Sequence, residues 1–337
     1  MRKKGLRVAV TASVLAMGLA LSGCGSKNES TTAASTTAET GTSAVSTEKN
    51  EEEDEEENYN TGDASLDKVR NEDGIGEKEL LVISFGTSFN DSRRLTIGAI
   101  EEALEKAFPD YSVRRGFTAN IVIDHVQRRD GVKIDDIDDA LKRAVANKVK
   151  TLVIQPTHLM HGIEYDELTG KVAEYADAFD KVVISEPLLA SDDDFKRVEQ
   201  AIVEWTKEYD DGETAVVFMG HGTEHESNAV YSKMQELLKS DGYKNYFIGT
   251  VEAEPSLDDV RKLLKEGGYK RVVLEPLMVV AGDHANNDMA GEEEDSWLSI
   301  LKADGYEVVV CLRGLGENEA IRQIYTDHAK KAIESLN

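Results

Sequence analysis

Apolar runs alternate with amphipathic stretches along most of the chain beyond residue 77. The apolar runs are rich in Val, Ile and Leu and are nearly continuous, which is typical of parallel strands buried on both faces. Strands are expected at 79–88, 111–118, 150–159, 180–190, 213–223, 245–253, 270–284 and 306–316. Helices are expected at 93–108, 134–149, 165–179, 227–240, 256–268 and 295–305, with helical patterns also around His125 and His328.

The two halves of this pattern resemble each other. LVISFGTS parallels VVFMGHGT, and KTLVIQPTHLMHGIEYDEL parallels KRVVLEPLMVVAGDHANND. The predicted fold class is therefore α/β, with two similar doubly wound parallel-sheet lobes, 77–205 and 206–337, facing each other across a cleft. Ligands of such sheets bind beyond the carboxyl ends of the strands. Alignment by eye pairs Pro156 with Pro276, Gly162 with Gly282, Glu164 with His284, and Gly86 with Gly220.

The N-terminus has the pattern of an export signal. Four basic residues among the first seven precede the apolar stretch 8–21, which predicts a signal peptide over 1–23. Its Leu-Ser-Gly-Cys ending resembles a bacterial lipobox, which implies cleavage before Cys24 and a lipid on that thiol. An ordinary signal peptide is the alternative. The expected location is the outer face of the cytoplasmic membrane, or the periplasm where an outer membrane exists.

Residues 24–76 are expected to form a disordered acidic tether outside the fold. Ser, Thr and Ala dominate its first part, and the run Glu51–Glu57 follows. Such a composition buries too little apolar surface to offset the entropy of ordering. The formal net charge of −26 argues against nucleic acid as a partner and against adsorption to anionic lipid. The lipid on Cys24 would then be the only attachment to the membrane.

The cysteine count and the motifs limit the chemistry. With Cys24 lipidated, the only other cysteine, Cys311, has no partner for a disulfide, and it is expected to be a small buried residue in a strand. No GxxxxGK[ST] sequence occurs, so no nucleotide is expected. No redox cofactor is expected either.

Three residues of metal-binding types follow three strands of the second half. His221 comes after AVVFMG, Glu252 after YFIGTV, and His284 after MVVAGD. Because the carboxyl ends of parallel strands meet at one edge, these residues are expected to converge, and two imidazoles with one carboxylate suit a borderline divalent metal. For each residue alone, a structural role is the alternative. Asp283 is expected to orient His284, whereas His328 is expected at the surface.

Six motifs carry a resemblance to a known family. LLVISFGTSFNDSR, FTANIVIDHVQRRDGVKID, GHGTEH, GTVEAEPSLDD, PLMVVAGDHANNDMAGEEEDSW and LRGLGENEAIR occur in this order. Together they resemble the anaerobic sirohydrochlorin cobaltochelatases, which are class II chelatases like the protoporphyrin ferrochelatases. The resemblance covers 78–335 and implies insertion of Co²⁺ into a tetrapyrrole without nucleotide hydrolysis. It places the metal ligands on His221, Glu252 and His284, although typical members are cytoplasmic and lack a lipobox.

Catalytic and auxiliary roles follow from this resemblance. His221 is expected to act as the base that accepts a pyrrole proton, with Glu252 balancing charge. His158 and His161 are candidate auxiliary ligands, for the metal or for haem.

Substrate contacts are expected mainly from the first half. Sirohydrochlorin carries many carboxylates while the chain is acidic, so local cations are needed. The predicted substrate-binding residues are Ser84, Gly86, Thr87, Arg93 and Arg115.

Two other functions fit the same residues. The chain could be a surface-tethered lipoprotein that binds tetrapyrrole, haem or metal for an importer, or a chelatase for Fe²⁺ or Ni²⁺. A homo-oligomer or an importer partner is compatible with each of these functions.

Overall fold

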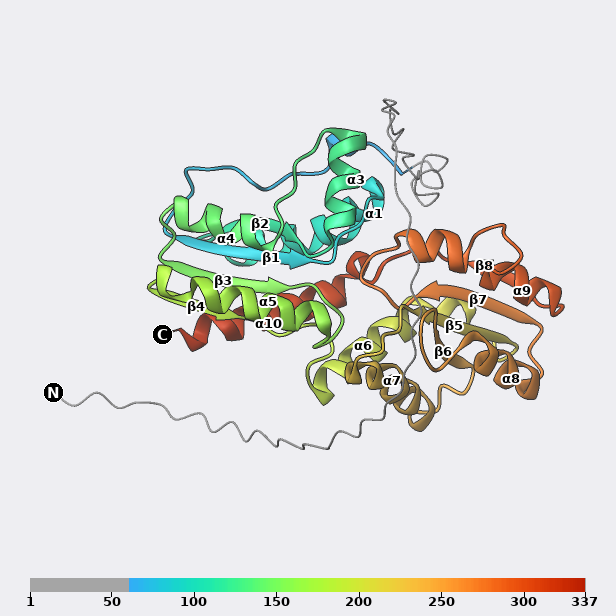
Figure 1. Ribbon diagram of the computed structural model, residues 1–337. Helices are drawn as coiled ribbons and strands as arrows, with labels where there is room; N and C mark the ends of the chain where they lie inside the picture. Colours follow the sequence, from blue (N-terminus) through green and yellow to red (C-terminus); the bar gives the residue numbers. More distant parts are fainter. Residues whose placement is uncertain (1–60, 337) are drawn as a thin grey trace, which may run out of the picture. The chain divides into compact units, whose positions relative to one another are not determined.

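The computed structural model describes residues 61–336 (Figure 1). The predicted signal peptide, Cys24 and the glutamate run lie outside these residues. None of the helices within 61–336 combines the length and apolar character needed to cross a membrane.

Two four-stranded parallel sheets form the described part of the chain. The first has the order β2-β1-β3-β4 and the second the order β6-β5-β7-β8, so the topology is repeated. We call these sheets with their flanking helices the N-terminal and C-terminal lobes. The predicted fold class and the presence of all eight predicted strands are confirmed, but each strand ends earlier than predicted, and Cys311, expected to be buried in a strand, follows β8 and is only partly buried. The strands are β1 (Lys78–Ser84), β2 (Ser112–Phe117), β3 (Thr151–Pro156), β4 (Lys181–Ile184), β5 (Thr214–Gly220), β6 (Tyr246–Thr250), β7 (Arg271–Pro276) and β8 (Glu307–Val310).

Helices connect the strands of each lobe. The first half contains α1 (Asn90–Arg93), the π-helical turn η4 (Arg94–Gly98), α2 (Ala99–Ala107), α3 (Asn120–Asp130), α4 (Ile137–Ala146), α5 (Ile163–Tyr175) and α6 (Asp192–Trp205). The second half contains α7 (Ala229–Ser240), α8 (Leu257–Gly267), the π-helical turn η8 (Ala285–Met289), α9 (Trp297–Ala303) and α10 (Glu319–Ser335). Helix α6 was not predicted, although Ser191 and Asp194 form a capping box at its start.

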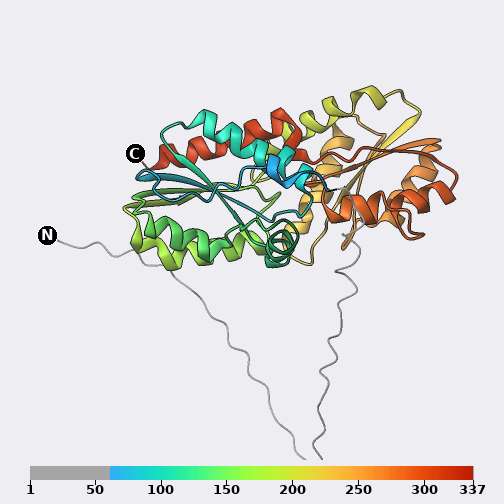
Figure 2. The ribbon, with the colours of Figure 1, turned by 90° about the horizontal axis from the view of Figure 1, so that it is seen from above.

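The C-terminal helix covers the sheet of the other lobe. Helix α10 packs on α2 and β3, so one face of the N-terminal sheet lies under α2 and α10 and the other under α4 and α5. Figure 2 shows α10, in red, beside the teal α2, with the green α4 and α5 on the opposite side of the strands. The predicted division into 77–205 and 206–337 therefore holds for the strands but is wrong for α10.

One hydrophobic core joins the two lobes. It contains inward side chains of β1 and β5, such as Val82 and Phe218, together with Val198 of α6 and Ile324 of α10. Each of these four side chains is almost completely buried. Because α6 and α10 pack on each other between the sheets, the lobes share apolar surface, and burial of that surface is a main source of stability.

The strand register confirms one part of the predicted internal alignment. Ile83 of β1 lies opposite Pro156 of β3, and Met219 of β5 lies opposite Pro276 of β7. Pro156 and Pro276 therefore occupy equivalent positions, as predicted.

The same register corrects the other part. Ser84 and Gly220 each follow the paired residue directly, so they are equivalent, and Gly86 corresponds to Gly222 rather than to Gly220. Both Gly86 and Gly222 adopt positive φ, at 107° and 88°. The alignment by eye was two residues out because it matched the first glycine of each motif.

The segment 61–76 belongs to the fold, which corrects the predicted end of the tether. The Gly62 carbonyl accepts a hydrogen bond from Asn90 at 3.2 Å, and the Thr61 carbonyl accepts one from the Asp91 amide at 2.8 Å. Asp67 further along the segment reaches the interior of the N-terminal lobe. The composition of 24–76 gave no sign of these contacts because each depends on a partner distant in sequence.

Candidate metal centre

Three side chains gather at the carboxyl edge of the C-terminal sheet. His221 directly follows β5, Glu252 follows β6 by two residues, and His284 immediately precedes η8. One ligand atom of each lies within 4.8 Å of the others, and within 61–336 this is the group of three metal-binding side chains that could hold an ion. The two imidazoles are nearly perpendicular, with centroids 4.6 Å apart. The predicted convergence of the strand ends is confirmed.

Backbone contacts fix two of these residues relative to each other. The Glu252 amide donates to the His221 carbonyl at 2.9 Å. Gly222 allows this approach, because a Cβ at its φ of 88° would lie 2.8 Å from the Ala253 nitrogen. The Gly222 amide also donates to the buried Tyr231 hydroxyl at 3.4 Å. Sequence reasoning missed Tyr231, which looks like any core residue of an amphipathic helix.

Each imidazole of the site leaves the same nitrogen available. Nδ1 of His221 lies 2.7 Å from the Gly222 carbonyl oxygen, and Nδ1 of His284 lies 2.8 Å from Oδ2 of Asp288. Because a carbonyl or a carboxylate oxygen can only accept, Nδ1 carries the proton in both rings. Nε2 therefore keeps the lone pair that a metal ion needs.

Asp288 takes the role that was predicted for Asp283. The Asp283 carboxylate instead accepts a hydrogen bond from Asn287 at 2.6 Å. The chain enters the helical turn at His284, which brings the residue four positions later alongside the ring. The prediction failed because it assumed an extended loop, in which the adjacent residue would have been the nearest carboxylate.

We expect the Asp288→Asn variant to bind Co²⁺ about 10–100-fold more weakly at alkaline pH, the range for loss of a residue that orients a metal ligand. The hydrogen bond that the His284 ring donates to Asp288 raises the pKa of His284 above its ordinary value. Because the pKa of His284 is raised, protons begin to compete with Co²⁺ for this ring at a higher pH than for an ordinary histidine. The Co²⁺ affinity of the wild-type protein should therefore fall as the pH drops through that raised pKa. In the variant this loss should begin at a lower pH. Calorimetric titrations with Co²⁺ across the pH range would check both effects, and identical pH profiles would contradict the assignment.

The loop that carries His284 is attached to the N-terminal lobe. The Ala281 amide donates to Ser92 Oγ of α1 at 3.0 Å. At a second point, His225 Nε2 lies 3.8 Å from Oδ2 of Asp166, on α5. These residues follow the carboxyl ends of strands in both lobes, so the two carboxyl edges face each other, as the duplicated pattern predicted.

The first βα turn uses its predicted substrate-binding groups internally. Ser84 is buried, and its hydroxyl accepts a hydrogen bond from Thr157 Oγ1 at 2.7 Å. Gly86 and Thr87 are also buried. Among these residues of the turn, Phe85 has the side chain that reaches solvent. It is 47% exposed and was not predicted as a site residue.

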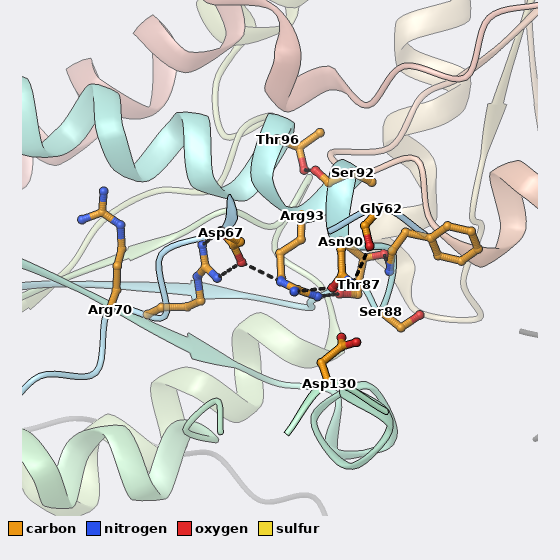
Figure 3. A network of polar contacts seen from close by, with 12 residues as sticks. Gly62, Asp67, Arg70, Thr87, Ser88, Asn90, Ser92, Arg93, Thr96 and Asp130 are labelled. Atoms are coloured by element: carbon orange, nitrogen blue, oxygen red, sulfur yellow. Dashed lines mark hydrogen bonds and ion pairs between the residues drawn. The ribbon is translucent and has the colours of Figure 1, made fainter. Parts of the chain in front are cut away.

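Arg93 and Arg115 were predicted to meet the substrate, but the structure buries both guanidinium groups. Arg93 is 0% exposed and Arg115 is 2% exposed. Asp67 accepts from Arg93 Nε at 2.7 Å and from Arg115 Nη1 at 2.6 Å, while Glu101 accepts from Arg115 Nε at 2.7 Å. Figure 3 shows Arg93 running from Asp67 to the carbonyl of Thr87. The arginines therefore stabilise the lobe and support its first turn, and a surface role for them is wrong.

His158, His161 and His328 do not belong to the three-residue group. Both ring nitrogens of His158 are buried without a hydrogen-bond partner, and burial lowers the pKa of this histidine to about 4, so it is neutral. His161 is exposed, with Nε2 2.6 Å from Oε2 of Glu186. His328 is buried, with Nε2 2.9 Å from Oδ1 of Asp194, so its predicted surface position is wrong.

The fold is shared with a solved structure. SirB from Bacillus subtilis with Fe³⁺ superposes with a TM-score of 0.53 at 13% identity, covering 77% of this chain and 97% of that one. At this identity the likeness concerns the fold alone.

Sequence comparison gives the family. The model of the cobalt chelatase (CbiK) family matches residues 78–334, and the chain belongs to that family. It is 36% identical over 257 residues to a sirohydrochlorin cobaltochelatase of Salmonella typhimurium, covering 76% of this chain and 97% of that protein. It is 32% identical over 280 residues to sirohydrochlorin cobaltochelatase CbiKC of Nitratidesulfovibrio vulgaris, covering 81% of this chain and 97% of that protein.

Proposed function

We propose that this protein inserts Co²⁺ into sirohydrochlorin. The observation that carries the proposal is the His221, Glu252 and His284 group at one sheet edge, in a chain of the cobalt chelatase family. The names of the two relatives support both the metal and the tetrapyrrole.

The charge and number of the ligands suit a metal that must be handed on. Two neutral imidazoles and one carboxylate carry a single negative charge, so they attract Co²⁺ without neutralising it fully. Three protein ligands leave coordination positions open for the nitrogens of the tetrapyrrole. The site is also half open to solvent, with the His221 and Glu252 side chains 42% and 53% exposed. Metal and tetrapyrrole can therefore meet at the same edge.

Insertion exchanges two pyrrole N–H protons for one Co²⁺, without oxidation or reduction. As Co²⁺ moves from the protein to the tetrapyrrole nitrogens, the Nε2 lone pair of His221 becomes free to accept one proton. Glu252 offsets the positive charge that then develops on the imidazole ring, and the second pyrrole proton passes to solvent, to which the group is half exposed. Holding both reactants together supplies much of the rate.

The test is a spectrophotometric assay with the full-length protein. Sirohydrochlorin is mixed with Co²⁺, Fe²⁺ or Ni²⁺ in turn, and the absorbance change is compared with a control that lacks protein. The proposal requires that the protein accelerate Co²⁺ insertion over the control and over its effect with the other two metals. Tight binding of sirohydrochlorin without acceleration would instead make the protein a tetrapyrrole carrier.

We further propose that the protein is exported and held at the membrane by a lipid on Cys24. The support is the basic N-terminus, the apolar stretch 8–21 and the Leu-Ser-Gly-Cys sequence. The Cys24→Ser variant is expected to leave the membrane fraction or to remain unprocessed, because one thiol carries the anchor. Fractionation of cells that express wild type or variant checks this, and unchanged membrane association of a processed variant would refute it.

A further inference from the structure

The N-terminal lobe contains a counterpart of the metal centre. In the C-terminal lobe the Glu252 amide donates to the His221 carbonyl at 2.9 Å. In the N-terminal lobe the Ala119 amide donates to the Phe85 carbonyl at 3.2 Å, in the same place relative to the strands. The register of the two prolines extends the correspondence to the third residue. The equivalent pairs are His221 with Phe85, Glu252 with Ala119, and His284 with Glu164.

This counterpart has apolar character where the metal centre is polar. A phenylalanine and an alanine replace two of the three ligands, so one carboxylate remains and a metal site is not expected here. Phe85 is 47% exposed, Ile121 70% and Ile163 58%, and each follows a different strand of the N-terminal sheet. Strands β1, β2 and β3, which these residues follow, are themselves buried along almost their whole length. Exposed apolar side chains gathered at a single edge indicate a binding surface.

Two contacts bring this edge opposite the metal centre. A Cβ on Gly282, in the His284 loop, would lie 3.0 Å from Thr87 Oγ1, and a Cβ on Gly162 would lie 3.4 Å from Ser227 Oγ. Gly162 and Gly282 are equivalent positions of the two lobes, and their partners, Ser227 and Thr87, follow β5 and β1 respectively. The two glycines are related by the internal duplication, whereas Thr87 corresponds to Thr223 and not to Ser227. Phe85 lies in the turn after β1 and His221 in the corresponding turn after β5, and the edges that carry these turns face each other.

We propose that Phe85 binds the face of the tetrapyrrole opposite to the face that receives Co²⁺. A metal ion enters a planar macrocycle from one side, so the ring must lie over His221, Glu252 and His284 with its other face toward the N-terminal lobe. An aromatic side chain at that face offers apolar contact and stacking without competing for the metal. This inference rests on the proposed function, because it takes the bound ring to be sirohydrochlorin.

The experiment is a titration of the full-length protein with metal-free sirohydrochlorin, together with a separate Co²⁺ titration. Phe85→Ala is expected to weaken sirohydrochlorin binding about tenfold or more, because the apolar contact of half an aromatic side chain is lost. Phe85→Tyr, which keeps the ring, should bind within about threefold of wild type. Co²⁺ affinity and melting temperature should be unchanged in both variants. Leu263→Ala is the matched control. Leu263 is an apolar residue of α8 that is 42% exposed, similar to Phe85, and the substitution truncates it in the same way.

The inference is overturned if Phe85→Ala binds sirohydrochlorin as wild type does. It is also overturned if the variant loses Co²⁺ affinity in parallel, because Phe85 would then hold the facing metal edge in place. Failure of the proposed function looks different, since wild-type protein itself would then not accelerate cobalt insertion.

Discussion

Replacing His221 with alanine is expected to slow Co²⁺ insertion by at least ~10²-fold, the usual contribution of a general base. The variant loses a metal ligand and the proposed proton acceptor together. The protein should stay folded, because the His221 side chain is 42% exposed and makes its hydrogen bond only to the neighbouring Gly222 carbonyl. Initial rates of insertion at several Co²⁺ concentrations would measure the effect.

Two further variants separate metal binding from proton transfer. Glu252→Gln keeps the shape but leaves Co²⁺ with neutral ligands, so Co²⁺ affinity should drop while folding is intact. His284→Ala should also weaken Co²⁺ binding but retain some insertion at high metal concentration, because His221 remains. Melting temperatures should stay within a few degrees of wild type in all three variants. Unchanged cobalt affinity in three folded variants would place the metal site elsewhere.

Replacing Asp67 with alanine is expected to cost about 3–5 kcal/mol of stability, as is typical when one partner of a buried ion pair is removed. Burial opposes ionisation of Asp67, but hydrogen bonds from Arg115 and Arg93 outweigh it and lower the pKa of the carboxyl group. Without that carboxylate, Arg93 keeps hydrogen bonds only to neutral oxygens, and Arg115 keeps only Glu101. Denaturant unfolding measured by circular dichroism would give the change in free energy.

The adjacent residue supplies the control. Lys68 is 59% exposed at its side chain and pairs with Glu102 and Glu105 at 3.7 and 3.5 Å, so Lys68→Ala should change stability by less than about 1 kcal/mol. Equal effects of the two substitutions would show that Asp67 contributes no more than a surface charge. The composition of 25–74 alone suggests that its deletion would be harmless. Deletion is instead expected to destabilise the lobe, because it removes Asp67 and also Arg70, whose Nε lies 3.1 Å from the buried Glu101 carboxylate.

The sheets and the three ligands were predictable because both depend on local patterns. Buried parallel strands appear as apolar runs, and polar residues at their ends must meet at one edge. His221, Glu252 and His284 could be found this way. The packing of α10 on the other lobe could not, because an amphipathic helix shows which face is buried but not which sheet covers it.

The contacts that sequence reasoning missed join residues far apart in the chain or depend on exact backbone geometry. Asp67 meets Arg93 and Arg115 across 26 and 48 positions. Asp288 reaches His284 only because a π-helical turn begins there. Phe85 gained significance only when the strand register showed that it stands where the other lobe has His221.

The central claim is that Co²⁺ binds between His221, Glu252 and His284. Anomalous diffraction at the cobalt absorption edge, from crystals of the protein soaked in Co²⁺, tests it most directly. We predict one dominant peak within bonding distance of Nε2 of both imidazoles and of the Glu252 carboxylate, and its loss in Glu252→Gln crystals soaked at limiting metal. A dominant peak at another place, such as His161 and Glu186, with none at the three residues, would contradict the claim.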